Sequence, residues 1–145
     1  MNISNLIFTQ KQKQPEKQVQ KILAALVYLI AKCDEYYDPL ELAFFDYLNK
    51  KTKILDNFSK QDVLASITIA DDLRKNKEMD NRLKYICDKI PPEYKHLAFY
   101  LSYKSMLADK RIVEEEKKIL TIIKKHLNIC DEHEQEIINY IYNEK

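Results

Sequence analysis

Two segments of this 145-residue chain share one pattern: LIAKCDEYYDPLE at residues 29–41 and MLADKRIVEEE at residues 106–116. In each, an apolar run leads to an aspartate, and a glutamate follows seven positions later. Asp34 and Asp109 are 75 positions apart, as are Glu41 and Glu116. The same ungapped shift pairs Leu26 with Leu101, Tyr28 with Tyr103, Phe45 with Leu120, Leu48 with Ile123 and Ile54 with Ile129. The repeat predicts two similar helical hairpins packed about a pseudo-two-fold axis.

Around these segments, apolar residues recur with a period close to 3.6, which is typical of amphipathic helices. The apolar stripes fall within residues 22–30, 40–48, 63–70, 83–90, 97–107, 119–127 and 137–141. In the third stripe, the side chains expected to face the core are Val63, Leu64, Ile67 and Ala70. The sequence therefore predicts an all-α fold of about seven helices, without strands.

Helix boundaries are marked by capping residues and prolines. Residues 38–41 (Asp-Pro-Leu-Glu) place a capping aspartate, a proline and an acidic third residue in order, and Ser59 with Asp62 forms a weaker version. Pro91-Pro92 ends one helix and begins the next. Because the chain has no glycine, asparagine is expected in the left-handed position at helix ends, at Asn49, Asn76 and Asn128. Residues 74–80 fit either a break or a continuous helix.

The composition excludes several classes of function. An average chain of this length has about ten glycines, and this one has none. Phosphate-binding glycine loops, nucleophile elbows and EF-hands are therefore excluded. The chain is 46% hydrophobic and 32% charged, which is typical of a single globular domain, taken here as residues 1–145. Its formal charge of +1 gives no reason to expect nucleic acid as a partner.

Cysteine usage and the first residues bear on compartment. Cys33, Cys87 and Cys130 are an odd number without a CxxC motif, which favours a reducing cytoplasm. No stretch approaches the length of a membrane span. Residues 1–14 are expected to be a flexible lead-in. Ile3, Leu6 and Ile7 have helical spacing, so this end could also dock on the body or touch a lipid surface, and docking or fraying is favoured.

The repeated pattern resembles the TerB-like tellurite-resistance family. In this pattern an apolar helix is followed by an aspartate, then by a hydrophobic residue and then by a glutamate in the next helix. The resemblance covers about residues 17–142 and implies an all-helical domain associated with tellurite and chemical stress. It also implies divalent-cation binding through acidic residues, and a role in protein complexes, including membrane-associated ones, rather than in catalysis. The family has Asp-Gly in the turns, whereas this chain has Asp34-Glu35 and Asp109-Lys110.

The acidic residues of the repeat form the candidate metal site: Asp34, Glu41, Asp109 and Glu116. Carboxylate oxygens suit hard cations, so Ca²⁺ or Mg²⁺ is favoured over Zn²⁺. Acids in a first helical turn also serve as caps, and this role is expected for most of the set, with the aspartate pair as the exception. Lys110 and Arg111 place positive charge beside Asp109 and should weaken cation binding there.

Other side chains have weaker chemical signals. His126, Cys130 and His133 have zinc-like spacing, but a tetrahedral site needs a fourth ligand, so surface and capping roles are favoured. Tyr36-Tyr37 and the Tyr100/Tyr103 pair are expected near the acidic turns, where tyrosine suits an interface.

The sequence therefore predicts a non-catalytic, cytoplasmic interaction module whose partners are other proteins, with a divalent cation as its only expected cofactor. One alternative is a metal-dependent hydrolase that uses the acidic turns, which would require a deep pocket with converging acids. A second is a structural scaffold without metal, and a dimer is compatible with either.

Overall fold

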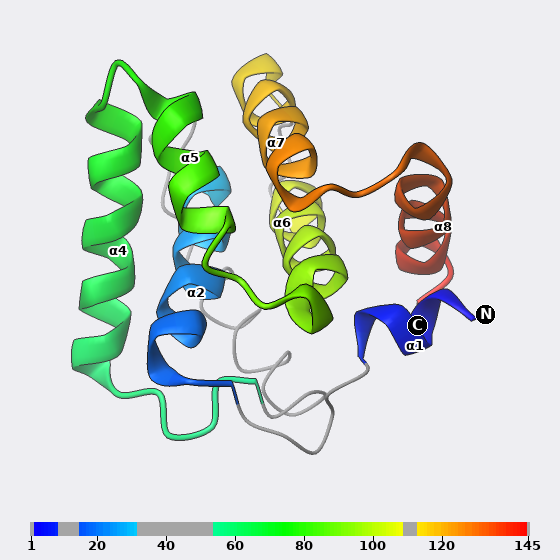
Figure 1. Cartoon of the computed structure of the whole chain (residues 1–145), viewed down its shortest axis with the longest axis horizontal. Coiled ribbons are helices and arrows are strands. Elements are labelled where there is room, and N and C mark those ends of the chain that lie inside the picture. Colours follow the sequence, from blue (N-terminus) through cyan, green and yellow to red (C-terminus); the bar gives the residue numbers. More distant parts are fainter. Residues whose placement is uncertain (1, 9–14, 32–53, 109–112, 145) are drawn as a thin grey trace.

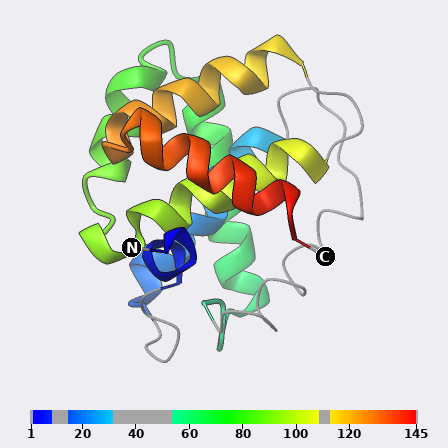
Figure 2. The same ribbon diagram turned by 90° about the vertical axis from the view of Figure 1, so that its right-hand side faces the viewer.

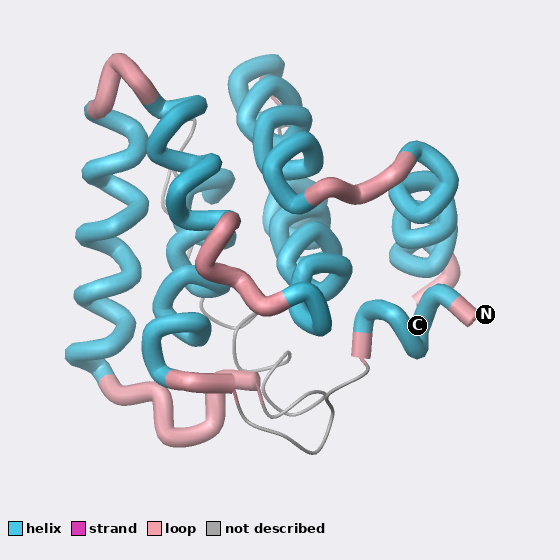
Figure 3. Tube along the Cα trace, viewed as in Figure 1, coloured by secondary structure: helices cyan, strands magenta, loops and turns pink. Residues whose placement is uncertain are grey.

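The computed structural model of the chain describes residues 2–8, 15–31, 54–108 and 113–144. Within these ranges the chain forms helices and loops, without strands (Figure 3). The helices are α1 (Ile3–Ile7), α2 (Lys17–Ala31), α4 (Lys60–Lys75), α5 (Met79–Cys87), the 3-10 turn η1 (Pro92–Tyr94), α6 (Lys95–Ala108), α7 (Glu114–Leu127) and α8 (Asp131–Tyr142). The predicted all-helical fold is confirmed there; the helix expected over residues 40–48 lies outside the described residues.

The helices pack around two central ones, α2 and α6 (Figures 1 and 2). α2 contacts α4 on one side and α6 on the other, and α5 bridges α4 and α7. α1 and α8 both lie against α6 and against each other. None of the described helices combines the length and the apolar character needed to cross a bilayer.

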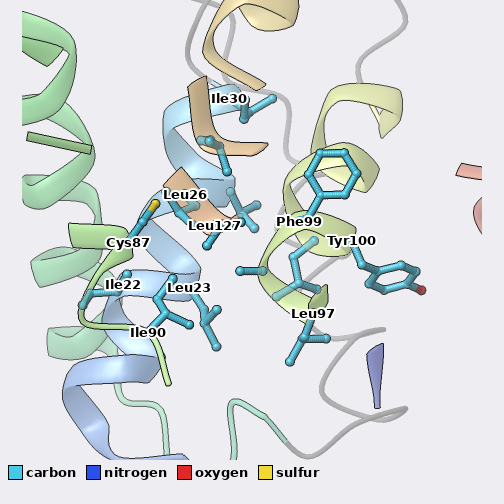
Figure 4. Packing of buried hydrophobic residues seen from close by; sticks show 14 of the residues in the cluster. Ile22, Leu23, Leu26, Ile30, Cys87, Ile90, Leu97, Phe99, Tyr100 and Leu127 are labelled. Carbon is cyan, nitrogen blue, oxygen red and sulfur yellow. The ribbon is translucent and has the colours of Figure 1, made fainter. Parts of the chain in front are cut away.

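The core is built mainly from α2 and α6 because these helices are apolar on nearly every side. Every residue of α2 from Ile22 to Ala31 is buried, as is every residue of α6 from Leu97 to Ser102. A helix apolar around its whole circumference belongs in the interior of a bundle. Figure 4 shows Leu23 and Leu26 of α2 and Leu97 and Phe99 of α6 among the side chains of one buried cluster.

α2 and α6 are also the helices that the 75-residue shift aligns. They run in the same general direction, and their last turns lie toward the same end of the molecule (Figures 1 and 2). This arrangement is compatible with two related hairpins. The helix that would complete the first hairpin lies in residues 32–53, outside the described residues, so the pseudo-two-fold packing stays a prediction.

Several predicted boundaries are confirmed. The Ser59 hydroxyl accepts from the Asp62 N–H at 3.1 Å, and the Asp62 carboxylate accepts from the Ser59 N–H at 2.9 Å. This backbone hydrogen bond, helped by Lys17, lowers the pKa of Asp62 to about 2. η1 and α6 follow Pro91 as expected. Asn128 ends α7 at φ 57°, ψ 41°, in the left-handed region.

One of the three asparagine expectations needs correction. Asn76 is extended, at φ −85° and ψ 129°, because its side chain accepts from the Glu78 N–H and turns the chain into α5. The left-handed residue that was missed is Asn57, at φ 64°. Asn49 lies outside the described residues.

Residues 60–90 form two helices, α4 and α5, and the inward face predicted for α4 is partly wrong. The buried residues of α4 are Ser66, Ala70 and Leu73, whereas Leu64 is 62% exposed. Ser66 fits this buried strip because its hydroxyl donates to the Asp62 carbonyl one turn earlier. The prediction used only the helical spacing of apolar residues, so it included Leu64 in the buried face and left out Ser66.

Part of the expected lead-in forms a helix that contacts the body. α1 docks on α6 and α8 and buries Ile7 and Phe8, whereas residues 1 and 9–14 of the expected flexible lead-in lie outside the described residues. The Phe8 ring meets the rings of Tyr100 and Tyr140 edge-on, with centroids 5.4 and 6.1 Å away. The docking suggested by the spacing of Ile3, Leu6 and Ile7 is thus the arrangement seen.

Candidate functional site

Of the four acidic candidates, the structure describes one. Asp34, Glu41 and Asp109 lie outside the described residues. Glu116 is the third residue of α7 and is fully buried. Its Oε1 accepts a hydrogen bond from the Val113 N–H at 2.9 Å, the return half of a capping box. Glu116 therefore has the capping role expected for most of the acidic residues.

The two described helices that lead into the acidic segments are joined near their C-terminal ends. The buried Ser105 hydroxyl of α6 donates to the Val27 carbonyl of α2 at 2.9 Å. Val27 is four residues before the end of α2, and Ser105 is three residues before the end of α6. The last turns of α2 and α6 are therefore held side by side, as both views of the ribbon show (Figures 1 and 2).

The two tyrosines of α6 expected near an acidic turn face other groups. The Tyr100 hydroxyl donates to Glu144 Oε2 at 2.7 Å, and Lys104 Nζ lies 3.0 Å from Glu144 Oε1. Burial raises the pKa of Tyr103 to about 12, with further contributions from Tyr142 and Glu134. Both tyrosines thus face α8 and the residues after it, whereas Tyr36 and Tyr37 lie outside the described residues.

The zinc-like triplet does not converge. His126 Nε2 lies 2.5 Å from Asp80 Oδ1, which joins α7 to α5, and the pKa of Asp80 is lowered by Lys125 and then by His126. His133 Nδ1 lies 3.0 Å from His96 Nε2, which joins α8 to α6. The Cys130 sulfur accepts from the His133 N–H as the cap of α8. No group of three or more possible metal ligands gathers within the residues the structure describes.

A pocket that the sequence did not reveal lies between α2, α4 and α5. Its volume is about 180 Å³. The residues that line it are Gln18 and Ile22 of α2, Ile69, Asp72 and Leu73 of α4, and Arg82, Tyr85, Ile86 and Lys89 of α5 and the turn after it. Four of these side chains are aliphatic and the charged ones are exposed, so the pocket has an apolar lining and a charged rim.

One charged side chain on the rim of this pocket, that of Lys89, contacts an aromatic ring. Lys89 Nζ lies 4.4 Å from the centroid of the Tyr85 ring, a cation–π distance. Within the described part of the chain, Arg82, Lys89 and Asp72 form no ion pair. The rim therefore presents two positive charges from the α5 side and one negative charge from α4.

Comparison with protein-family models, characterised proteins and solved structures finds no match.

The hydrolase alternative required acids that converge on a deep pocket. The α2–α4–α5 pocket has a single carboxylate, Asp72, beside two cations. Nothing in its lining resembles a set of metal ligands, so this pocket does not supply that chemistry.

Sequence reasoning missed the pocket because it depends on how three helices meet. The useful signal was the chain break at residues 76–78, which folds α5 back along α4. Ile69 and Ile86 are only half-buried, although both pack against the core. These two side chains line the pocket between the helices.

Proposed function

We propose that this chain is a non-catalytic, cytoplasmic helical interaction module, resembling the TerB-like family, whose two aspartate segments respond to a divalent cation. The single observation that supports it most is the buried hydrogen bond between Ser105 and Val27. It holds together the two helix ends that precede the acidic segments.

The chemistry of those segments follows from their residue types. Asp109 comes directly after the last residue of α6, and Asp34 comes three residues after the last residue of α2. Carboxylate oxygens contributed by two segments suit Ca²⁺ or Mg²⁺ better than Zn²⁺. Because Glu116 acts as a cap, the ligand set is reduced to Asp34, Asp109 and Glu41. Lys110 and Arg111 follow Asp109 in the sequence and weaken cation binding by charge repulsion. The dissociation constant for Ca²⁺ or Mg²⁺ should therefore be about 0.1–1 mM.

Titration calorimetry with Ca²⁺, Mg²⁺ and Zn²⁺ tests the cation. The wild-type protein is compared with Asp34→Asn/Asp109→Asn and with a control of equal charge change, Asp72→Asn/Asp88→Asn, at exposed positions of the described chain. We expect Ca²⁺ or Mg²⁺ binding in the wild type and the control and its loss in the first variant. Equal heats of binding in all three proteins would exclude cation binding by the two aspartates and would leave a structural scaffold without metal.

The interaction role is tested with a partner assay. The chain is used as bait in cell extract with and without chelator, and the membrane fraction is analysed separately. We expect protein partners, including members of a membrane-associated stress complex, whose retention falls with chelator and in Asp34→Asn/Asp109→Asn. Free thiols at buried Cys87 and exposed Cys130 agree with a reducing cytoplasm as the compartment of this assay.

A further inference from the structure

The α2–α4–α5 pocket has the size and lining of a binding site for a small apolar group. Its volume of about 180 Å³ is below the roughly 300 Å³ at which pockets for drug-sized ligands begin. A dry aliphatic cavity of about 150 Å³ accommodates benzene. The apolar body of an occupant is therefore about one aromatic ring in size.

The base of the pocket is aliphatic and close to the core. Ile22 and Leu73 are 1% and 2% exposed, and Ile69 and Ile86 are half-buried beside them. Such a surface offers contact to an apolar body but no hydrogen bond. Binding of that body is driven by removal of apolar surface from water.

The polar part of the occupant is set by the rim. Arg82 and Lys89 both come from the α5 side and form no ion pair among the described residues. Arginine presents paired donors that match a carboxylate. Lys89 is already positioned over the Tyr85 ring, so less side-chain freedom is lost when an anion binds beside it. Asp72 gives the α4 side the opposite charge, which directs an anionic group toward α5.

We propose that this pocket binds a small monocarboxylate whose apolar body is about one aromatic ring in size. The ring lies on Ile22, Leu73 and Ile86, and the carboxylate lies between Arg82 and Lys89. This binding is separate from the proposed cation response, because none of the residues that line the pocket lies in the two acidic segments, residues 29–41 and 106–116.

The probe is phenylacetate, with phenylacetamide as its neutral counterpart, titrated into ¹⁵N-labelled full-length protein with chelator present. At about 20 mM salt, where screening is weak, we expect amide shifts confined to α2, α4, α5 and the turn that contains Lys89. Phenylacetate should bind about threefold or more tighter than phenylacetamide, the gain expected for two exposed ion pairs. Raising the salt should reduce this difference.

Two variants separate the contributions of rim and base. Arg82→Gln/Lys89→Gln should bring phenylacetate binding down to that of phenylacetamide. The control Arg74→Gln/Lys84→Gln removes the same charges from α4 and α5 away from the pocket and should leave the preference intact. Ile69→Phe should fill the pocket and abolish both ligands, while unchanged amide signals from α6–α8 show that the protein remains folded.

The proposal is overturned by any of three results. These are the absence of localised shifts at saturating phenylacetate, equal affinity for acid and amide in the wild type, and retention of binding in a folded Ile69→Phe variant.

Discussion

Glu115 and Glu116 are neighbours in the first turn of α7, yet their surroundings differ completely. Glu115 is exposed, whereas Glu116 is fully buried and accepts the Val113 N–H. Both carboxylates interact favourably with the helix N-terminus, but only Glu116 satisfies a backbone donor. Identical residue types can therefore be told apart by burial and by one hydrogen bond.

Truncating Glu115 and Glu116 separately measures how much the cap contributes to the free energy of unfolding. We expect Glu116→Ala to lower the free energy of unfolding by about 2 kcal/mol, because a cap and buried contacts are lost together. Glu115→Ala should cost less than about 0.5 kcal/mol. Urea denaturation of both variants gives the comparison, and equal costs would contradict a capping role for Glu116.

Among the helices, most local signals were predictable, apart from the conformations of Asn57 and Asn76, and long-range partners were not. The capping box at Ser59 and the left-handed Asn128 depend on residues within one turn, so the sequence was sufficient for both. The partners of His126 and His133, which are Asp80 and His96, lie 46 and 37 positions away. Surface and capping roles were favoured over zinc for these two histidines and Cys130, and Cys130 does cap α8. The spacing did not predict that packing assigns each histidine to a different helix interface.

The contact between His96 and His133 predicts that the α6–α8 interface is sensitive to pH. In the neutral pair, one ring nitrogen donates to the other across 3.0 Å. Burial, and then the neighbouring His133, hold the pKa of His96 below its usual value near 6.5. A histidine whose pKa is lower in the folded than in the unfolded state stabilises the fold above pH 6.5, and this stability is lost as the pH falls below it.

Hydrogen exchange tests this pH dependence. Between pH 7.5 and pH 5.5, after correction for the intrinsic rates, protection of α8 should fall in the wild type. It should fall much less in His96→Asn. The matched variant His126→Asn, at the α5–α7 interface, should retain the response in α8. An equal response in His96→Asn and wild type would assign the sensitivity to other groups.

At the scale of the whole molecule, the sequence predicted the fold class because the apolar period runs through almost the entire chain. It also predicted that α2 and α6 occupy equivalent places in two hairpins; both helices are central in the structure, and the equivalence stays a prediction. The α2–α4–α5 pocket and the docking of α1 could not be predicted in detail, because each depends on the relative placement of three helices. Such placement follows from packing of side chains far apart in sequence.

The peripheral helices α1 and α8 should open more readily than the central helix α2. Phe8 is 7% exposed and its ring joins α1 to Tyr100 of α6 and Tyr140 of α8. Phe8→Ala should lower the free energy of unfolding by about 3 kcal/mol. Exchange should rise in α1 and α8 while the amides of α2 remain the slowest, because α2 is buried on every side from Ile22 to Ala31. Leu64→Ala, which truncates an exposed residue of α4, should cost less than about 1 kcal/mol. If Phe8→Ala instead raised exchange equally in α4, the bundle would open as one unit and α1 would be part of its common core.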